Sequence, residues 1–119
     1  MYYRYEIYEK TEYIGGLFRG ITIVLDDLNN EAEQGYECAI ADYDYLDMVI
    51  GGMEEMLISP DLYAYDEVTF YFTEHGYSLV KEQLEGLAEV LSRWGYTLVE
   101  DVVETVGDIV YEDVLQVAV

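Results

Sequence analysis

The sequence is poor in positively charged residues, and this shortage argues against several functions. Only 5 of the 119 residues are Lys or Arg, against 26 Asp or Glu, which gives a formal net charge of −21. Direct binding to nucleic acid depends on Lys and Arg at the phosphates, so we do not expect it. Binding to an anionic membrane surface is disfavoured for the same reason.

Cysteine, histidine and long apolar runs are also scarce. The single Cys38 cannot form an internal disulfide, and together with the single His75 it supplies too few ligands for a structural zinc ion. No apolar run approaches the roughly 20 residues of a membrane span, and the first residues lack the pattern of a signal peptide. We therefore expect a cytoplasmic protein of a host cell, with no membrane association and no cofactor.

Apolar residues make up 52% of the chain, which is enough for one core, so residues 1–119 are expected to form a single domain. Apolar spacings of three and four, and alternation with a period of two, predict an α+β fold. About three helices are expected, over residues 14–28, 46–57 and 77–94. A four- or five-stranded mixed or antiparallel sheet is expected from residues 3–8, 36–41, 67–72, 96–103 and 109–117.

Residues that can cap or end a helix mark the limits of the predicted helices, and two segments fit either a helix or a strand. Thr11 is the expected cap of the first helix, Asp42 or Asp44 of the second and Thr73 of the third, with Gly95 ending the third. The β-branched residues 21–24 leave a strand open as the alternative to the first helix, and residues after Gly35 leave a helix open. Residues 104–108 are expected to join the last two strands as a hairpin.

Smaller features add three expectations. Cys38 is expected to be a small buried strand residue. The pair Gly51–Gly52 is expected to allow close packing of the second helix or to bend it. The apolar run 114–119 at the chain end either fills the core as a strand or pairs across a dimer.

The acidic residues are concentrated where bases are absent. Residues 21–79 contain fourteen acids and no Lys or Arg. In the second predicted helix, four acids fall within about 100° of one another, opposite the apolar stripe. These four residues are Asp44, Asp47, Glu54 and Glu55.

Two pairs of acids lie where a helix disfavours them. Glu54 and Glu55 are near the C-terminus of the second helix, where the helix dipole makes each carboxylate unfavourable by about 0.3–1 kcal/mol. Asp26 and Asp27 are expected to repeat this placement in the first helix. Stability alone favours Lys or Arg at these positions, so a function that needs carboxylates is indicated, with general acidity for solubility as the alternative.

The amount of charge and the abundance of tyrosine point to a protein partner. Twenty-one charges correspond to about 36 Å of duplex DNA, and a compact sphere of this chain length has a diameter of about 35 Å. The 14 tyrosines can supply rigid contact area at an interface. The cluster Tyr43, Tyr45, Tyr63 and Tyr65 is the strongest candidate for that role, with core packing as the alternative.

Motifs for catalysis or for dedicated metal binding are weak. Asp42, Asp44 and Asp47 resemble part of a calcium loop, but Asp47 and Met53 stand where such a loop needs Gly and Glu. No phosphate-binding loop is present. We therefore do not expect an enzyme or a dedicated metal site.

The sequence thus favours a non-enzymatic acidic inhibitor that mimics nucleic-acid phosphate and blocks the basic groove of a nucleic-acid-binding protein. The expected partner is a nuclease or effector complex. The inhibitor is expected to be of the anti-restriction or anti-CRISPR type and of phage or mobile-element origin. The expected contact residues are Asp42, Asp44, Asp47, Glu54 and Glu55, then Asp26 and Asp27, with the four clustered tyrosines. The alternative is an acidic scaffold or homo-oligomeric subunit, such as a homodimer, with no connection to nucleic acid.

Overall fold

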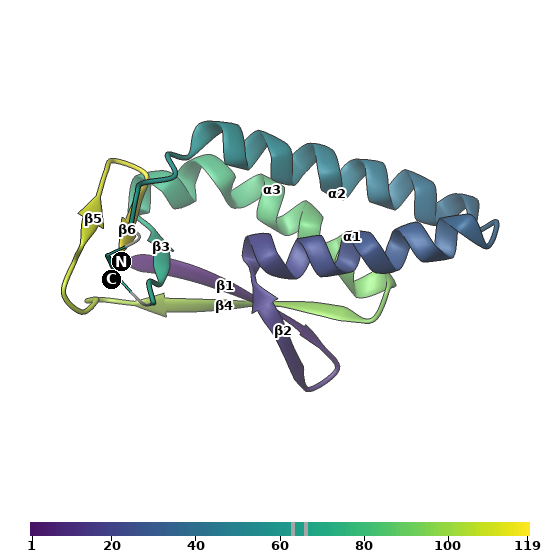
Figure 1. Cartoon of the computed structure of the whole chain (residues 1–119), viewed down its shortest axis with the longest axis horizontal. Helices are drawn as coiled ribbons and strands as arrows, with labels where there is room; N and C mark the ends of the chain where they lie inside the picture. Colours follow the sequence, from purple (N-terminus) through teal and green to yellow (C-terminus); the bar gives the residue numbers. More distant parts are fainter. Residues whose placement is uncertain (63, 66) are drawn as a thin grey trace.

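A computed structural model describes residues 1–62, 64–65 and 67–119 (Figure 1). The three helices are α1 (Leu17–Glu33), α2 (Glu37–Met56) and α3 (Glu74–Arg93). The strands are β1 (Tyr2–Glu9), β2 (Glu12–Gly16), β3 (Phe70–Phe72), β4 (Tyr96–Val103), β5 (Tyr111–Glu112) and β6 (Gln116–Ala118). The expected α+β class is confirmed, with a sheet of six strands.

The sheet is antiparallel throughout and is organised around β1. Strand β4 pairs with β1 along its whole length, from Tyr2 opposite Val103 to Glu9 opposite Tyr96. On the other side of β1 lie β2 and, at Tyr3, β3. Strands β6 and β5 then extend the sheet beyond β3.

The helices lie over one face of this sheet (Figure 1), and the core is formed between the two layers. The largest fully buried side chains come from β1, β6 and all three helices. They are Ile7, Ile21, Val24, Leu28, Leu46, Val80, Leu87, Leu91 and Val117. Helix α1 approaches β1 closely at Gly20, where a Cβ atom would lie 2.9 Å from the Ile7 side chain.

Helix α3 matches its sequence prediction closely. The Thr73 hydroxyl accepts a hydrogen bond from the Gly76 amide at 3.1 Å, which is the expected N-cap. The predicted apolar face is buried at Val80, Leu84 and Leu87. Gly95 follows the helix with a φ of +85°, a left-handed conformation that suits glycine after a C-cap.

The first helix begins later than predicted, because residues 12–16 form strand β2. Lys10 takes a left-handed φ of 56° in the turn, and Glu12–Gly16 then pairs with β1. Thr11 therefore lies in a hairpin turn and does not cap a helix. The helix prediction for residues 21–24 is confirmed, and Gly16 is the N-cap of α1 without a side-chain hydrogen bond.

The second helix begins earlier than predicted, at Glu37, so the strand predicted for residues 36–41 is wrong. The alternation of apolar and polar residues in that segment does not decide its structure. Ala39 is buried on the same face of the helix as Leu46 and Ile50, so the segment continues one apolar helical stripe. Asp42 and Asp44 consequently lie inside α2 and do not cap it. Cys38 is exposed in the first turn, which contradicts the prediction of a buried strand residue.

Two further predictions are corrected. A Cβ atom at Gly51 or Gly52 would meet nothing within 4 Å, so close packing does not require these glycines. The predicted C-terminal hairpin is absent, because β4 pairs with β1 while β6 pairs with β3 and β5. Strand β6 is buried, which agrees with the interpretation that the apolar chain end fills the core.

The molecule is elongated, with extents of 47 × 29 × 28 Å and a radius of gyration of 15.0 Å. The spherical estimate from chain length was therefore too compact. The long axis follows the paired helices α1 and α2 (Figure 1).

Candidate protein interface on α2

Four acids of α2 form an exposed face. Asp44, Asp47, Glu54 and Glu55 are all exposed, and none forms an ion pair within the described parts of the chain. At 1.5 Å per residue, Asp44 and Glu55 are about 16 Å apart along the helix. Their common face, predicted from the sequence, is thus an extended row of negative charge in solvent.

Asp42 occupies a different environment and holds two helices together. Its side chain is buried, and Oδ2 accepts a hydrogen bond of 2.7 Å from Nε1 of Trp94. Its Oδ1 lies 3.6 Å from the Arg93 guanidinium. The structure therefore places Asp42 between α2 and the end of α3, apart from the exposed row.

The two acids of α1 lie well inside that helix. Asp26 and Asp27 precede the last helical residue, Glu33, by seven and six positions, so the expectation that they lie near the helix end is wrong. Asp26 is exposed. Asp27 accepts a hydrogen bond from the hydroxyl of Tyr96, and this links α1 to the start of β4.

The tyrosines of the predicted cluster do not share one environment. Tyr43 and Tyr45 are half-buried and pack against the core. Tyr65 is 47% exposed, and Tyr63 lies outside the described residues. The structure therefore brings Tyr43 and Tyr45 to the helix packing and leaves Tyr65 available to solvent.

Five other tyrosines donate hydrogen bonds to carboxylates. The pairs are Tyr3–Glu74, Tyr5–Glu100, Tyr8–Glu6, Tyr96–Asp27 and Tyr111–Asp113. A phenol is neutral at pH 7, so it supplies a donor to the carboxylate without removing the negative charge. Much of the unusual tyrosine content thus accommodates the acids while keeping the net charge high.

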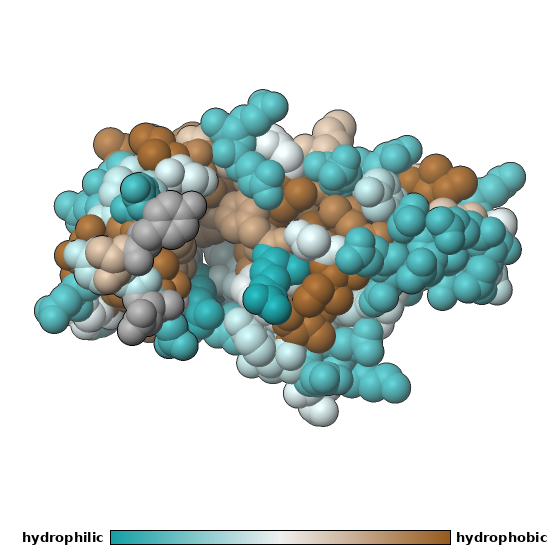
Figure 2. Space-filling view, in the orientation of Figure 1, coloured by the Kyte–Doolittle hydropathy of each residue, from teal (hydrophilic) through white to brown (hydrophobic). Residues whose placement is uncertain are grey.

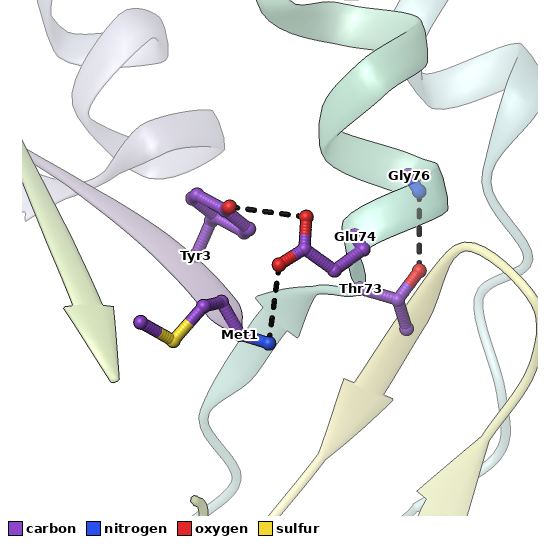
Figure 3. Close-up of polar contacts among 5 residues, drawn as sticks. All are labelled: Met1, Tyr3, Thr73, Glu74 and Gly76. Atoms are coloured by element: carbon purple, nitrogen blue, oxygen red, sulfur yellow. Dashed lines mark hydrogen bonds and ion pairs between the residues drawn. The ribbon is translucent and has the colours of Figure 1, made fainter. Parts of the chain in front are cut away.

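These contacts raise the pKa of the tyrosines concerned. Burial raises the pKa of Tyr5 and of Tyr96 well above the ordinary value of 10, and the acceptors Glu100 and Asp27 add to the shift. Tyr3 shares Glu74 with the amino group of Met1 (Figure 3), and its pKa is raised by partial burial and by that carboxylate. All of these phenols remain neutral donors at physiological pH.

Two exposed apolar side chains were missed by the sequence analysis. Met48 of α2 is 68% exposed and Leu79 of α3 is 46% exposed, and both line a groove between their helices. The available signal was the position of Met48, which falls outside the apolar stripe of its own helix. Met48 is a candidate contact residue because it lies beside Leu79 in the groove and not alone on the surface.

No group of three or more His, Cys, Asp or Glu within residues 1–62, 64–65 and 67–119 could hold a metal ion. In the same ranges, no helix combines the length and hydropathy needed to cross a membrane.

The surface also has a hollow at the C-terminal end of α2, where Glu54 lines it. Its walls include Phe18, Phe70 and the segment 57–60, and it is visible left of centre in Figure 2. Hydrophilic side chains crowd the opposite end of the molecule, where α1 turns into α2.

Comparisons with protein-family models, with curated proteins and with solved structures found no match.

Proposed function

We propose that this protein is a non-enzymatic inhibitor whose acidic surface occupies the phosphate-binding groove of a basic nucleic-acid-binding protein. The partner is a nuclease or nuclease-containing effector complex, and the inhibitor is of the anti-restriction or anti-CRISPR type. The observation that carries the proposal is the exposed row Asp44, Asp47, Glu54 and Glu55, which lacks basic partners among the described residues.

The distribution of the few bases supports this reading. Arg4 pairs with Glu6 at 2.8 Å, and Arg93 pairs with the buried Asp42. Neither arginine neutralises the exposed row on α2. A chain selected only for a stable acidic surface gains from interspersed bases, and residues 21–79, which include α2, contain none.

The dimensions support phosphate mimicry quantitatively. A net charge of −21 along a 47 Å axis is about one charge per 2.2 Å. Duplex DNA carries one charge per about 1.7 Å. Averaged over the whole molecule, the net charge per unit length is therefore roughly three-quarters of that of a duplex, and a negative potential of this kind steers a basic groove towards the protein.

Binding then follows from charge-assisted hydrogen bonds. Carboxylates of the α2 row pair with the Arg and Lys side chains that otherwise hold phosphates, and an Arg–carboxylate pair can be bidentate. Tyr65, which is exposed, can add apolar contact area to the interface. The inhibitor performs no chemistry and competes by occupying the groove.

A competition assay tests the proposal. Labelled DNA is bound to each member of a panel of nucleases and nuclease effector complexes, and this protein is added over a range of salt concentrations. Displacement from particular members, weakening as salt rises, is the expected result. Absence of displacement at low salt contradicts mimicry and favours the acidic scaffold or oligomer.

A matched pair of variants tests the assignment to α2. The triple variant D47K/E54K/E55K reverses three acids of the row, while E89K/E104K/D108K makes the same change in net charge at exposed positions of α3 and of the segment after β4. The α2 variant is expected to lose displacement much more strongly than this control. Equal loss in both indicates nonspecific polyanion behaviour and overturns the assignment.

A further inference from the structure

An apolar groove of about 300 Å³ runs between α2 and α3, beside the acidic row. Met48, Gly52 and Met56 line it from α2, and Leu79 and Gln83 line it from α3. Met48 and Leu79 are among the exposed large apolar side chains of the protein. Exposed apolar side chains gathered in a groove are typical of a surface that binds a partner.

One close contact and one open position define the shape of this groove. Towards the start of α2, the Tyr45 hydroxyl lies against Gly86 of α3 so closely that a Cβ atom there would overlap it. Further along α2, Gly52 contributes no side chain, and a Cβ atom at that position would meet nothing within 4 Å. The helices are thus in close contact at Gly86 and leave open space at Gly52.

The rim of the groove is acidic. At 100° per residue, Asp44 and Glu55 lie within about 40° of Met48 around α2. Glu82 lies about 60° from Leu79 around α3. All three acids are exposed, so an occupant of the groove meets negative charge from both helices.

We infer that this groove binds a basic amphipathic helix of the partner protein, whose apolar side chains enter between α2 and α3 and whose Lys and Arg side chains pair with the acidic rim. This inference rests on the proposed function in taking the partner to be a basic protein. It adds that one helix of that partner is recognised by shape as well as by charge.

The chemistry of the groove favours this occupant. A surface formed by two antiparallel helices accepts a third helix through anchors spaced at i, i+3, i+4 and i+7. Methionine is unbranched and flexible, so Met48 and Met56 can adapt to different anchors. A second copy of this chain is disfavoured because its own acids would oppose Asp44, Glu55 and Glu82 across the interface.

The test uses two synthetic peptides and a pair of adjacent glycines. One 18-residue peptide carries Leu and Trp at helical spacing with Lys elsewhere, and the other has the same composition in scrambled order. Gly52→Leu fills the groove, whereas Gly51→Leu makes the same change at a neighbouring position that does not line it. Binding is measured by isothermal titration calorimetry at two salt concentrations.

The amphipathic peptide is expected to bind the unmodified protein and G51L alike, and to bind G52L on the order of tenfold more weakly. The scrambled peptide is expected to bind weakly to all three, through charge alone. Equal affinity for both peptides, or equal affinity of G51L and G52L for the amphipathic peptide, overturns the inference.

A second pair of variants guards against misfolding of G52L. Met48→Ser removes an exposed anchor of the groove, and Val114→Ser removes an apolar side chain that is 70% exposed in the segment between β5 and β6. Only M48S is expected to weaken peptide binding. Groove binding without displacement of DNA from any nuclease refutes phosphate mimicry and leaves the groove assignment standing, so the two failures are distinguishable.

Discussion

Helices α2 and α3 have the same length of 20 residues and pack against each other, yet their ends differ. Both have an acid in the first turn, but only α3 has a side-chain cap, at Thr73, and a base in its last turn, Arg93. Helix α2 has no side-chain cap and no base in its last turn. That turn instead contains Glu54 and Glu55.

The contrast extends to the helix interiors. Each helix contains glycines, which cost about 1 kcal/mol each relative to alanine in a helix. In α3 these glycines allow close contacts, Gly76 with the Leu115 carbonyl and Gly86 with Tyr45. In α2, Gly51 and Gly52 contact nothing that requires their small size. Helix α3 is therefore organised for stability, and α2 carries features that stability does not explain.

The largest effect is expected from the packed glycine of α3. In Gly76→Ala the new Cβ atom overlaps the Leu115 carbonyl oxygen and lies 2.9 Å from its carbon. Overpacking against backbone should destabilise the fold by about 2–3 kcal/mol. Chemical denaturation measures the loss, and a change below about 0.5 kcal/mol would show that the C-terminal segment shifts freely.

The cap of α3 is expected to have the next largest effect. Thr73 accepts from the Gly76 amide and donates a hydrogen bond of 2.6 Å to the Val114 carbonyl. Thr73→Ala should cost about 1–2 kcal/mol, whereas Thr73→Ser keeps both bonds and should cost less. If alanine and serine behave alike in thermal melts, the cap contributes little to the difference between the helices.

The sequence predicted α3 correctly because every local signal agreed there. Thr73, the apolar stripe and Gly95 all indicate the same helix. At the start of α2 the signals conflicted, since alternation over residues 36–41 resembles a strand and burial of Ala39 is decided by tertiary packing. The pairing of β4 with β1 spans most of the chain, and no local pattern reports such pairing.

The site shows the same division between local and long-range information. The common exposed face of Asp44, Asp47, Glu54 and Glu55 follows from helical periodicity alone. The burial of Asp42 does not, because its partner Trp94 is 52 residues away in the sequence. The groove beside Met48 likewise requires knowledge of which helix packs against α2.

Helix α2 should be easy to stabilise at an open glycine. Gly51 has no positive φ and has free space for a Cβ atom, so Gly51→Ala should raise stability by up to about 1 kcal/mol. Equilibrium denaturation of G51A beside G76A compares the two helices directly. A destabilised G51A variant would contradict the description of α2 as a helix not optimised for stability.

The acids at the end of α2 should oppose stability by a smaller amount. Glu55→Lys replaces a carboxylate, which the helix dipole disfavours at this end, by an ammonium group, which it favours. The variant should be more stable to unfolding by about 0.5 kcal/mol at low salt. The same variant is expected to bind the partner less well. Glu82→Lys, in the middle of α3, is the control, because the dipole acts mainly on the helix ends. A similar gain in stability in both variants would show that the lower net negative charge, and not the helix dipole, is the cause.

The smallest effect concerns the response to acid, which distinguishes partnered from unpartnered carboxylates. Burial alone would raise the pKa of Asp113, but hydrogen bonds from the Tyr111 hydroxyl and from the amides of Leu115 and Gln116 outweigh it and lower that pKa. Because the folded state holds the ionised form, this stabilisation is present above the unfolded value near pH 3.8 and is lost as the pH falls through the lowered value.

The acids of the α2 row, by contrast, form no ion pair within the part of the chain that the structure describes. Hydrogen exchange at the Leu115 and Gln116 amides should therefore accelerate, relative to the amides of α2, as the pH is lowered below about 4. Asp113→Asn should remove most of this pH dependence. Equal acid sensitivity of α2 and the β5–β6 turn would mean that the two groups of acids are held alike, and the contrast between partnered and free carboxylates would not stand.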